Sequence, residues 1–119
     1  MYISENDKVA IRQLIEQQIQ AFRQRDEVTA FALTSPAIQQ KYQQNDFIIA
    51  IESKYSAIVE PRSIMFQGFT LVNNYPALVA IIMNREGELA KGVFVVQHQS
   101  DYSWRIHGYE LLSVDEKII

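Results

Sequence analysis

Residues 51–72 read IESKYSAIVEPRSIMFQGFTLV, and the spacing of the apolar side chains changes within this stretch, at Pro61. Before Pro61 the apolar residues recur every three or four positions, which is the spacing of one face of a helix. After Pro61, β-branched and aromatic residues predominate, as they do in strands. Proline itself cannot continue a helix. The sequence therefore predicts a helical half followed by a sheet half.

Residues that cap helices divide the first half of the chain into segments. Serine and aspartate accept hydrogen bonds from the free amides at the start of a helix, and proline suits the first helical position. The helical half, about residues 4–59, is expected to contain a helix from Asp7 to Phe22 capped by Ser4, short helices after Asp26 and Ser35-Pro36, and a last helix from a cap at Asp46 to Ile58.

Four apolar runs in the second half predict four strands, at residues 64–72, 77–83, 89–99 and 102–112. The segments between them are short enough for hairpins, so sequential antiparallel pairing is expected. Helices first and strands afterwards are typical of an α+β fold, with helices packed on one face of a curved four-stranded antiparallel sheet. We expect one domain over residues 1–119, with the sheet over about 62–112. In the short C-terminal tail, Ile118 and Ile119 either fray or dock across a dimer.

The second expected strand, Ala77 to Met83, is apolar at every position. A strand with one face in water alternates between apolar and polar residues, so both faces of this strand should be covered. One layer of helices covers only one face of a sheet. The simplest second cover is another copy of the chain, and the sequence therefore predicts a homodimer through the sheet.

Composition narrows the classes of partner. The chain has no cysteine, which excludes disulfides, thiolate nucleophiles and thiolate metal sites. Its net charge is −3, so the basic surface of a protein that binds nucleic acid or an anionic membrane is not expected. No phosphate-binding glycine loop or paired-histidine zinc helix occurs, so no metal site and no cofactor are predicted. The N-terminus is acidic and lacks a leader pattern, which makes cytoplasmic residence the default expectation.

Two polar side chains on apolar helix faces are candidate binding residues. Gln18 lies in the stripe that carries Ile15 and Phe22, and a buried amide left unpaired costs about 1–3 kcal/mol. Its partner is either an internal group, which is the commoner case, or a ligand. Tyr55 in the last helix presents the same choice, because its ring suits the core and its hydroxyl needs a partner.

The two histidines are candidate general bases, because histidine titrates near neutrality without perturbation. His98 alternates with Phe94 along one expected strand. If Gln99 faces Tyr102 across the last turn, Phe94 pairs with His107 and both histidines lie on one face of the sheet. A solvated position at the rim of the sheet is the more common alternative for such residues.

Two groups of residues carry a resemblance to a known family. They are Ile11-Arg12, Ile15-Glu16, Gln18-Ile19, Ala21-Phe22-Arg23, Asp26, Ala30-Phe31-Ala32-Leu33, Ser35-Pro36 and Ile38-Gln39 in the first half, and Trp104-Arg105-Ile106, Gly108-Tyr109 and Leu111 in the second. With these residues the chain resembles an uncharacterised bacterial domain-of-unknown-function family, which looks like a member of the nuclear-transport-factor-2-like (cystatin-like) superfamily. The resemblance implies a cone, in which a curved antiparallel sheet wraps around helices, commonly in a dimer. Enzymes of that superfamily work inside the cone, but their catalytic aspartate has no counterpart here, since the strand region before Leu112 offers only Asp101, in a turn.

Three functions stay open at this point. The leading one is a non-enzymatic domain that binds a small hydrophobic molecule in a pocket between the first helix, the last helix and the concave sheet. The residues expected to line this pocket are Gln18, Phe22, Tyr55, Phe94, His98 and His107. The first alternative is an enzyme of the isomerase, dehydratase or polyketide-cyclase kind, with a pocket histidine as base and Tyr55 as hydrogen-bond donor. The second alternative is a dimerising protein-interaction module.

Overall fold

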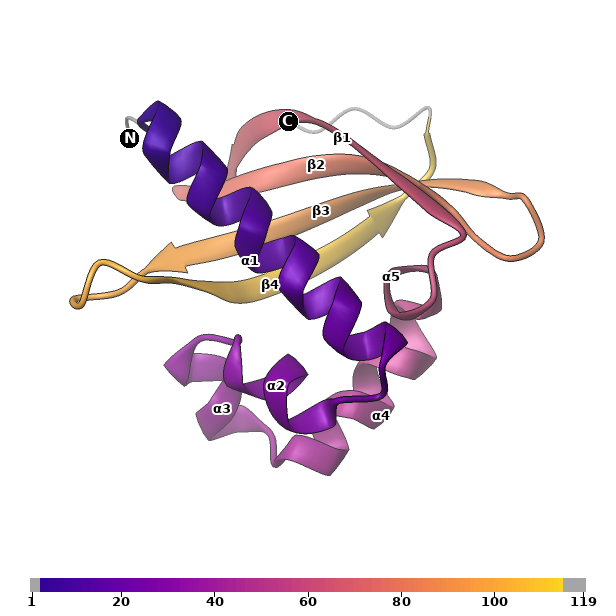
Figure 1. Cartoon of the computed structure of the whole chain (residues 1–119), viewed down its shortest axis with the longest axis horizontal. Coiled ribbons are helices and arrows are strands. Elements are labelled where there is room, and N and C mark those ends of the chain that lie inside the picture. The colour runs from indigo at the N-terminus through magenta and orange to yellow at the C-terminus, as the bar shows by residue number, and fades with distance from the viewer. Residues whose placement is uncertain (1–2, 115–119) are drawn as a thin grey trace.

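The computed structural model describes residues 3–114, in which five helices precede four strands (Figure 1). The helices are α1 (Glu5–Arg23), α2 (Glu27–Ala32), α3 (Pro36–Lys41), α4 (Gln44–Lys54) and α5 (Ser56–Val59). The strands are β1 (Ser63–Val72), β2 (Tyr75–Met83), β3 (Leu89–His98) and β4 (Trp104–Leu112). This order confirms the expected α+β class. The two tail isoleucines, Ile118 and Ile119, lie outside the described residues.

The first two helices begin at residues that the sequence identifies as caps. The hydroxyl of Ser4 accepts from the backbone N–H of Asp7 at 3.0 Å, and the carboxylate of Asp7 accepts from the backbone N–H of Ser4 at 3.1 Å. Ahead of α2, the carboxylate of Asp26 accepts from the backbone N–H of Thr29 at 3.1 Å. Hydrogen bonds from Ser4 lower the pKa of Asp7, and hydrogen bonds from Thr29 lower the pKa of Asp26, because they favour the ionised carboxylate.

The last expected helix, Asp46 to Ile58, is wrong as a single element. α4 begins at Gln44, so Asp46 lies in its first turn and does not cap it. Tyr55 then leaves the helical conformation, with φ −133° and ψ 45°, and separates α4 from α5. Beyond this break Ile58 is fully buried, and the ring of Tyr55 lies 5.7 Å from that of Tyr109. Packing in the folded chain therefore outweighs the continuity of the helix.

The strands form one antiparallel meander in the order β1-β2-β3-β4, as the short connections predict. The β1–β2 turn is Asn73-Asn74, whose positive φ angles of 50° and 68° suit a two-residue hairpin. One register shift lies in the β1–β2 ladder, and a second lies between Val95 and Val96 in the β3–β4 ladder. Such bulges increase the local twist, and the sheet curves over the helices (Figure 1).

The register of β3 and β4 differs from the expected one. The hairpin closes one residue later than expected, because the backbone N–H of Gln99 donates to the carbonyl oxygen of Ser103 at 2.8 Å. The bulge adds a second shift of one residue. Phe94 therefore pairs with Tyr109, and the expected pairing of Phe94 with His107 is wrong.

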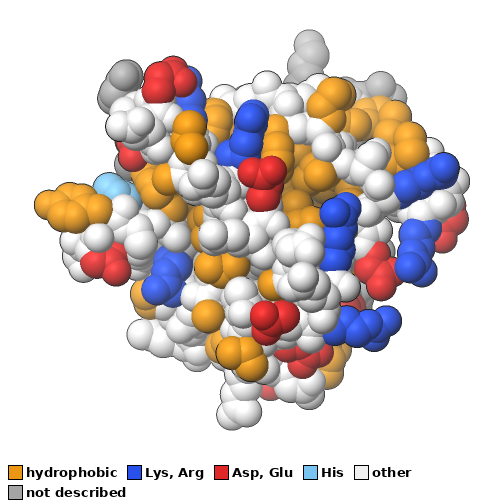
Figure 2. Space-filling model, viewed as in Figure 1, with side chains coloured by type: hydrophobic (Ala, Val, Ile, Leu, Met, Phe, Trp, Pro, Cys, Tyr) orange, Lys and Arg blue, Asp and Glu red, His pale blue; other side chains and the backbone are white. Residues whose placement is uncertain are grey.

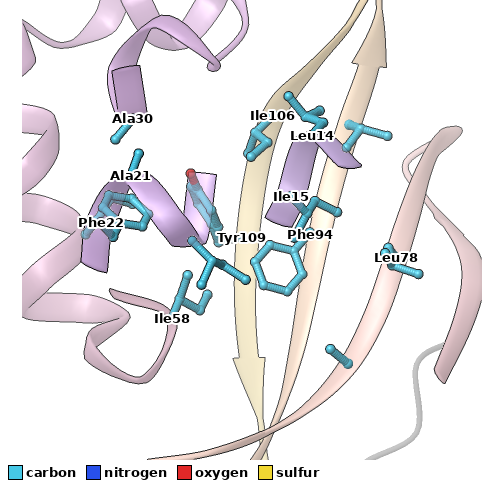
Figure 3. Packing of buried hydrophobic residues seen from close by; sticks show 14 of the residues in the cluster. Leu14, Ile15, Ala21, Phe22, Ala30, Ile58, Leu78, Phe94, Ile106 and Tyr109 are labelled. Atoms are coloured by element: carbon cyan, nitrogen blue, oxygen red, sulfur yellow. The ribbon is translucent and has the colours of Figure 1, made fainter. Parts of the chain in front are cut away.

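The core lies between α1 and the concave face of the sheet. Ile11 and Ile15 of α1 have no exposed surface, and neither does Phe94 of β3. Ile15 of α1 and the neighbouring-strand residues Phe94 and Tyr109 belong to one cluster of buried side chains (Figure 3). The space between α1 and the sheet is therefore filled by side chains.

On the convex face of the sheet, Ala77 and Val79 of β2 are buried within a single chain. Val72, Tyr75 and Leu112 pack there against a small cluster that includes Ala77. Ala77 and Val79 on the convex face of β2 are thus buried already in the single chain. The homodimer through the sheet stays a prediction.

The face that carries α1 presents basic and acidic side chains interspersed with one another (Figure 2). Two of the basic side chains of α1 cover aromatic rings of β1. The Nζ of Lys8 lies 6.0 Å from the ring centre of Phe69, and the guanidinium of Arg12 lies 5.3 Å from that of Phe66. In the described part of the chain, no helix combines the length and the apolar character that crossing a membrane requires.

Candidate functional site

Gln18 and Tyr109 form a buried polar pair that joins α1 to β4. The Tyr109 hydroxyl donates to Gln18 Oε1 at 2.5 Å, and Gln18 Nε2 donates to the carbonyl oxygen of Ala30 at 2.9 Å. Burial raises the pKa of Tyr109 far above its ordinary value, so the hydroxyl stays protonated and donates. Both polar ends of the Gln18 amide thus have partners inside the chain, which is the internal role and not the ligand-binding one.

Phe94 and His98 lie apart from each other. Phe94 is fully buried, with its ring 6.2 Å from that of Tyr109. His98 ends β3 with its ring stacked on Trp104, the ring centres being 4.4 Å apart, and its Nε2 lies 3.2 Å from the carbonyl oxygen of Tyr102. The place expected for the pocket, between α1 and the concave sheet, is therefore occupied by packed residues, and His98 is exposed at one end of the sheet.

A hollow of about 370 Å³ lies beside the outer edge of β4, between this strand and helices α3 and α4. We call it the β4 hollow. Its floor is formed by the buried side chains of Phe47, Ile51 and Tyr109. The other lining residues are Ala37, Ile38, Lys41, Tyr42, Ala50, Lys54, Tyr55, His107 and Gly108. Tyr55 and His107 are therefore the two expected site residues that share one hollow.

His107 occupies the extra position of the bulge in β4. Its Nδ1 lies 2.8 Å from the hydroxyl oxygen of Ser35, and its ring lies 4.7 Å from that of Tyr75. Ser35 precedes α3, but its hydroxyl caps no amide of that helix and engages His107 instead. Nearby, the backbone N–H of Ser35 donates to the carbonyl oxygen of Ile106 at 2.8 Å. The backbone N–H of Ile106 donates to the carbonyl oxygen of Leu33 at 2.9 Å. These contacts fix the imidazole at the border of the hollow.

Two lysines supply the permanent charge of the β4 hollow. Lys41 lies in the last turn of α3, and Lys54 lies in the last turn of α4. Among the described residues, no aspartate or glutamate lines this hollow. The Nζ of Lys41 lies 5.4 Å from the ring centre of Tyr42. The hollow thus combines an apolar floor with a cationic rim.

A second hollow, of about 350 Å³, lies on a different face of α4, next to the C-terminal end of α1. We call it the α1 hollow. The expected site residue Phe22 lines it together with Ile48. Its charged lining residues are Arg25, Asp26, Glu27, Glu52 and Glu60. Carboxylates therefore predominate here, and the two hollows have opposite charge.

The arrangement limits the chemistry that is available. Among residues 3–114, no three histidine, aspartate or glutamate side chains lie close enough together to hold a metal ion. Ser35 has no exposed surface, so its hydroxyl orients His107 and does not reach a substrate as a nucleophile would. What the β4 hollow offers is an apolar floor with hydrogen-bonding and cationic groups at its border.

Sequence reasoning finds Tyr55 and His107 in the β4 hollow but misses Lys41, Lys54 and Tyr42. Lysines are common in the last turn of a helix, where they offset the negative end of the helix dipole, so their position alone does not indicate a binding site. The available signal is that both lysines end consecutive helices. Only the fold shows that the two helix ends border one space.

Comparison with known proteins gives a family but no characterised relative. No curated protein and no solved structure matches the sequence. Residues 4–119 match the family described as Domain of unknown function (DUF4864), which confirms the expected kind of family. This match spans nearly the whole chain, and the protein therefore belongs to that family of uncharacterised domains.

Proposed function

We propose that the protein binds a small hydrophobic molecule in the β4 hollow. The observation that carries the proposal is a space of about 370 Å³ above a floor of buried apolar side chains, namely Phe47, Ile51 and Tyr109. Ligand pockets are concave, largely apolar and typically about 300–1,000 Å³ in volume. The β4 hollow lies at the small end of this range, so it suits a small ligand.

The floor of the hollow is held in place before any ligand arrives. The ring of Phe47 packs between those of Phe31 and Tyr42, at centre distances of 5.4 Å and 6.3 Å. Tyr109 is fixed by its hydrogen bond to Gln18. A preformed site loses little conformational entropy on binding, which leaves more of the contact energy for affinity.

The resemblance to the nuclear-transport-factor-2-like superfamily favours a binding role but points to a different place in the fold. Members of that superfamily work in a cone formed by helices and a curved sheet, and the curved sheet over α1 is consistent with such a cone (Figure 1). In this chain the space between α1 and the sheet is packed. The proposed site therefore lies at the outer edge of β4, where α3 and α4 meet the strand.

Titration with N-phenyl-1-naphthylamine, a neutral dye that fluoresces in apolar surroundings, tests the proposal. We expect saturable binding to the wild-type chain. Ala50→Phe and Ala37→Phe place a ring in the β4 hollow from two different helices, and each should weaken binding at least about tenfold, or about 1.4 kcal/mol. Ser56→Phe places a ring in the α1 hollow and should leave the affinity unchanged.

Two results would contradict the proposal. One is the lack of saturable dye binding to the folded wild-type chain. The other is binding that both filling variants leave unchanged while Ser56→Phe weakens it. Thermal melting, monitored by circular dichroism, establishes that each variant is folded before its affinity is compared.

A proton-transfer enzyme is a second candidate, favoured by the hydrogen bond between Ser35 and His107. In the tautomer whose Nδ1–H donates to the Ser35 hydroxyl, Nε2 carries the free lone pair and would accept a proton from a bound molecule. Tyr55 lines the same hollow and would donate to a developing oxyanion. The test is deuterium exchange into the α-positions of cyclohexanone in D₂O, monitored by NMR. Acceleration that His107→Gln abolishes and His98→Gln retains would support the enzyme, and exchange at the buffer rate would contradict it.

A further inference from the structure

We infer that the ligand of the β4 hollow is a small anionic amphiphile, with a carboxylate at one end of an apolar body. The inference deepens the proposed function and depends on it. It is drawn from the sign of the charge at the hollow, from the lack of ion pairs at its two lysines within the described chain, and from the hydrogen-bonding groups beside them.

The charge at the β4 hollow is opposite to the charge of the whole chain. The sequence has 14 acidic and 11 basic residues, so an average patch of surface is slightly negative. The β4 hollow nevertheless carries Lys41 and Lys54 and, within the described chain, no carboxylate. The α1 hollow on the other face of α4 has the reverse composition. An anion is therefore favoured at one hollow and disfavoured at the other.

The two lysines are not used in ion pairs within the described chain. The ion pairs that the structure shows over residues 3–114 join Lys8 to Glu5 at 3.4 Å and Arg85 to Glu60 at 3.3 Å. The ends of α3 and α4 account for part of the charge, because the C-terminus of a helix carries roughly half a negative charge. Two helix ends offset about one of the two lysine charges, and about one positive charge is left for a ligand.

The residues beside the lysines suit a carboxylate. Tyr42 and Tyr55 line the same hollow, and each has a hydroxyl able to donate a hydrogen bond. The contact of the Lys41 ammonium with the Tyr42 ring, at 5.4 Å, holds the charge near one of these hydroxyls. Hydrogen bonds to a charged acceptor are about twice as strong as neutral ones. The carboxylate therefore lies at the rim, and the apolar body lies on Phe47.

The size of the hollow selects a small molecule. Its volume of about 370 Å³ is bounded by α3, α4 and the edge of β4. Protein partners bury roughly 800 Å² on each side and need a broad surface, which a hollow of this size does not offer. A free amphiphilic acid is the occupant that fits both the volume and the charge.

Competition between three ten-carbon ligands tests the inference. Decanoate, 1-decanol and decylamine are titrated at pH 7.5 against the bound naphthylamine dye, at low and at high salt. We expect decanoate to displace the dye at concentrations about tenfold lower than those decylamine requires. High salt should weaken the binding of decanoate but not that of decanol. Equal displacement by decanoate and decylamine would overturn the inference.

Substitution of the lysines locates the effect. Lys41→Gln and Lys54→Gln should each lower the affinity for decanoate about fivefold and leave the affinity for decanol within about twofold of wild type. Lys8→Gln removes the same charge from α1, away from the hollow, and should change neither ligand. Retained affinity for the neutral dye establishes that the hollow is intact in each variant.

The outcomes separate the two levels of the proposal. If decanoate and decanol respond alike to both lysine variants, the anionic ligand is wrong while a hydrophobic site remains. If the wild-type chain binds no dye and no ten-carbon ligand, the proposed function itself is wrong. Loss of decanoate affinity in the lysine variants, with decanol unchanged, supports both.

Discussion

The two hollows beside α4 have nearly the same volume and opposite charge. The β4 hollow measures about 370 Å³ and the α1 hollow about 350 Å³. α4 contributes apolar floor residues to both, since Phe47 and Ile51 line the first and Ile48 lines the second. Their rims differ, with lysines at one and carboxylates at the other. Shape alone does not distinguish two such spaces, and charge decides which ligand each can hold.

The hollows also differ in how the fold builds them. The α1 hollow is bordered by helices and the segments that join them. The β4 hollow includes a strand edge, where a bulge and the contact of Ser35 with His107, 72 positions apart, fix the border. Because Ser35 and His107 are distant in the sequence, this border of the β4 hollow forms only when the whole chain is folded.

The largest expected effect concerns the floors of the two hollows. Phe47 is 2% exposed, and Phe47→Ala should lower the free energy of unfolding by about 3–5 kcal/mol through lost burial and a cavity. Ile48→Val, on the face toward the α1 hollow, removes one methylene and should cost about 0.5–1.5 kcal/mol. Urea unfolding measures both. A loss below about 1 kcal/mol for Phe47→Ala would show that the floor of the β4 hollow is not packed.

The next effect separates structure from binding at Gln18. Gln18→Leu leaves the Tyr109 hydroxyl and the Ala30 carbonyl oxygen without their partner, so the free energy of unfolding should fall by about 1–3 kcal/mol. Dye affinity at the β4 hollow should fall by less than the roughly tenfold loss expected for Ala50→Phe, because Gln18 fixes Tyr109 in the floor but does not itself line the hollow. Chemical denaturation and dye titration of the same sample give the two values. Weakened binding without lost stability would return Gln18 to the ligand site.

Charge reversal sharpens the contrast between the rims. Lys54→Glu places a carboxylate in the β4 hollow and should weaken decanoate about tenfold, or about 1.4 kcal/mol. Glu52→Gln removes a charge from the α1 hollow on the same helix and should change decanoate affinity less than twofold. Calorimetric titration of both variants measures the difference. An effect of Glu52→Gln larger than that of Lys54→Glu would contradict the account, because it would place the anion site in the α1 hollow.

The smallest effect is the response of the α1 hollow to acid. Hydrogen bonds from Thr29 hold the pKa of Asp26 below its ordinary value of 3.8. A carboxyl whose pKa is lower in the folded state adds stability that is fully present above the unfolded value and is lost as the pH falls through the folded value. Wild type should therefore lose more stability than Asp26→Asn between about pH 4 and pH 2. Thermal melts across this range measure it, and parallel losses in the two proteins would contradict it.

Local patterns in the sequence were sufficient for most of the architecture. The caps at Ser4 and Asp26 and the meander follow from residue type and spacing, because each depends on neighbours along the chain. The break at Tyr55 and the bulge at His107 depend on contacts with distant residues, and periodicity carries no information about these.

The site was less predictable for the same reason. Tyr55 and His107 stood out by residue type, but their common hollow arises only when α3 and α4 meet the edge of β4. Lys41 and Lys54 have the ordinary pattern of charged residues at helix ends. Gln18 was conspicuous in its apolar stripe because it hydrogen-bonds inside the core, and the sequence could not choose that partner.

The most direct test of the β4 hollow is an NMR titration of ¹⁵N-labelled protein with decanoate. Amide shifts should change in a saturable way at residues 37–42, 50–51, 54–55 and 107–109, and those of residues 22–27 and 59–60, beside the α1 hollow, should stay in place. Changes centred on residues 22–27 and 59–60, or no saturable change anywhere, would show that the cationic hollow is not the binding site.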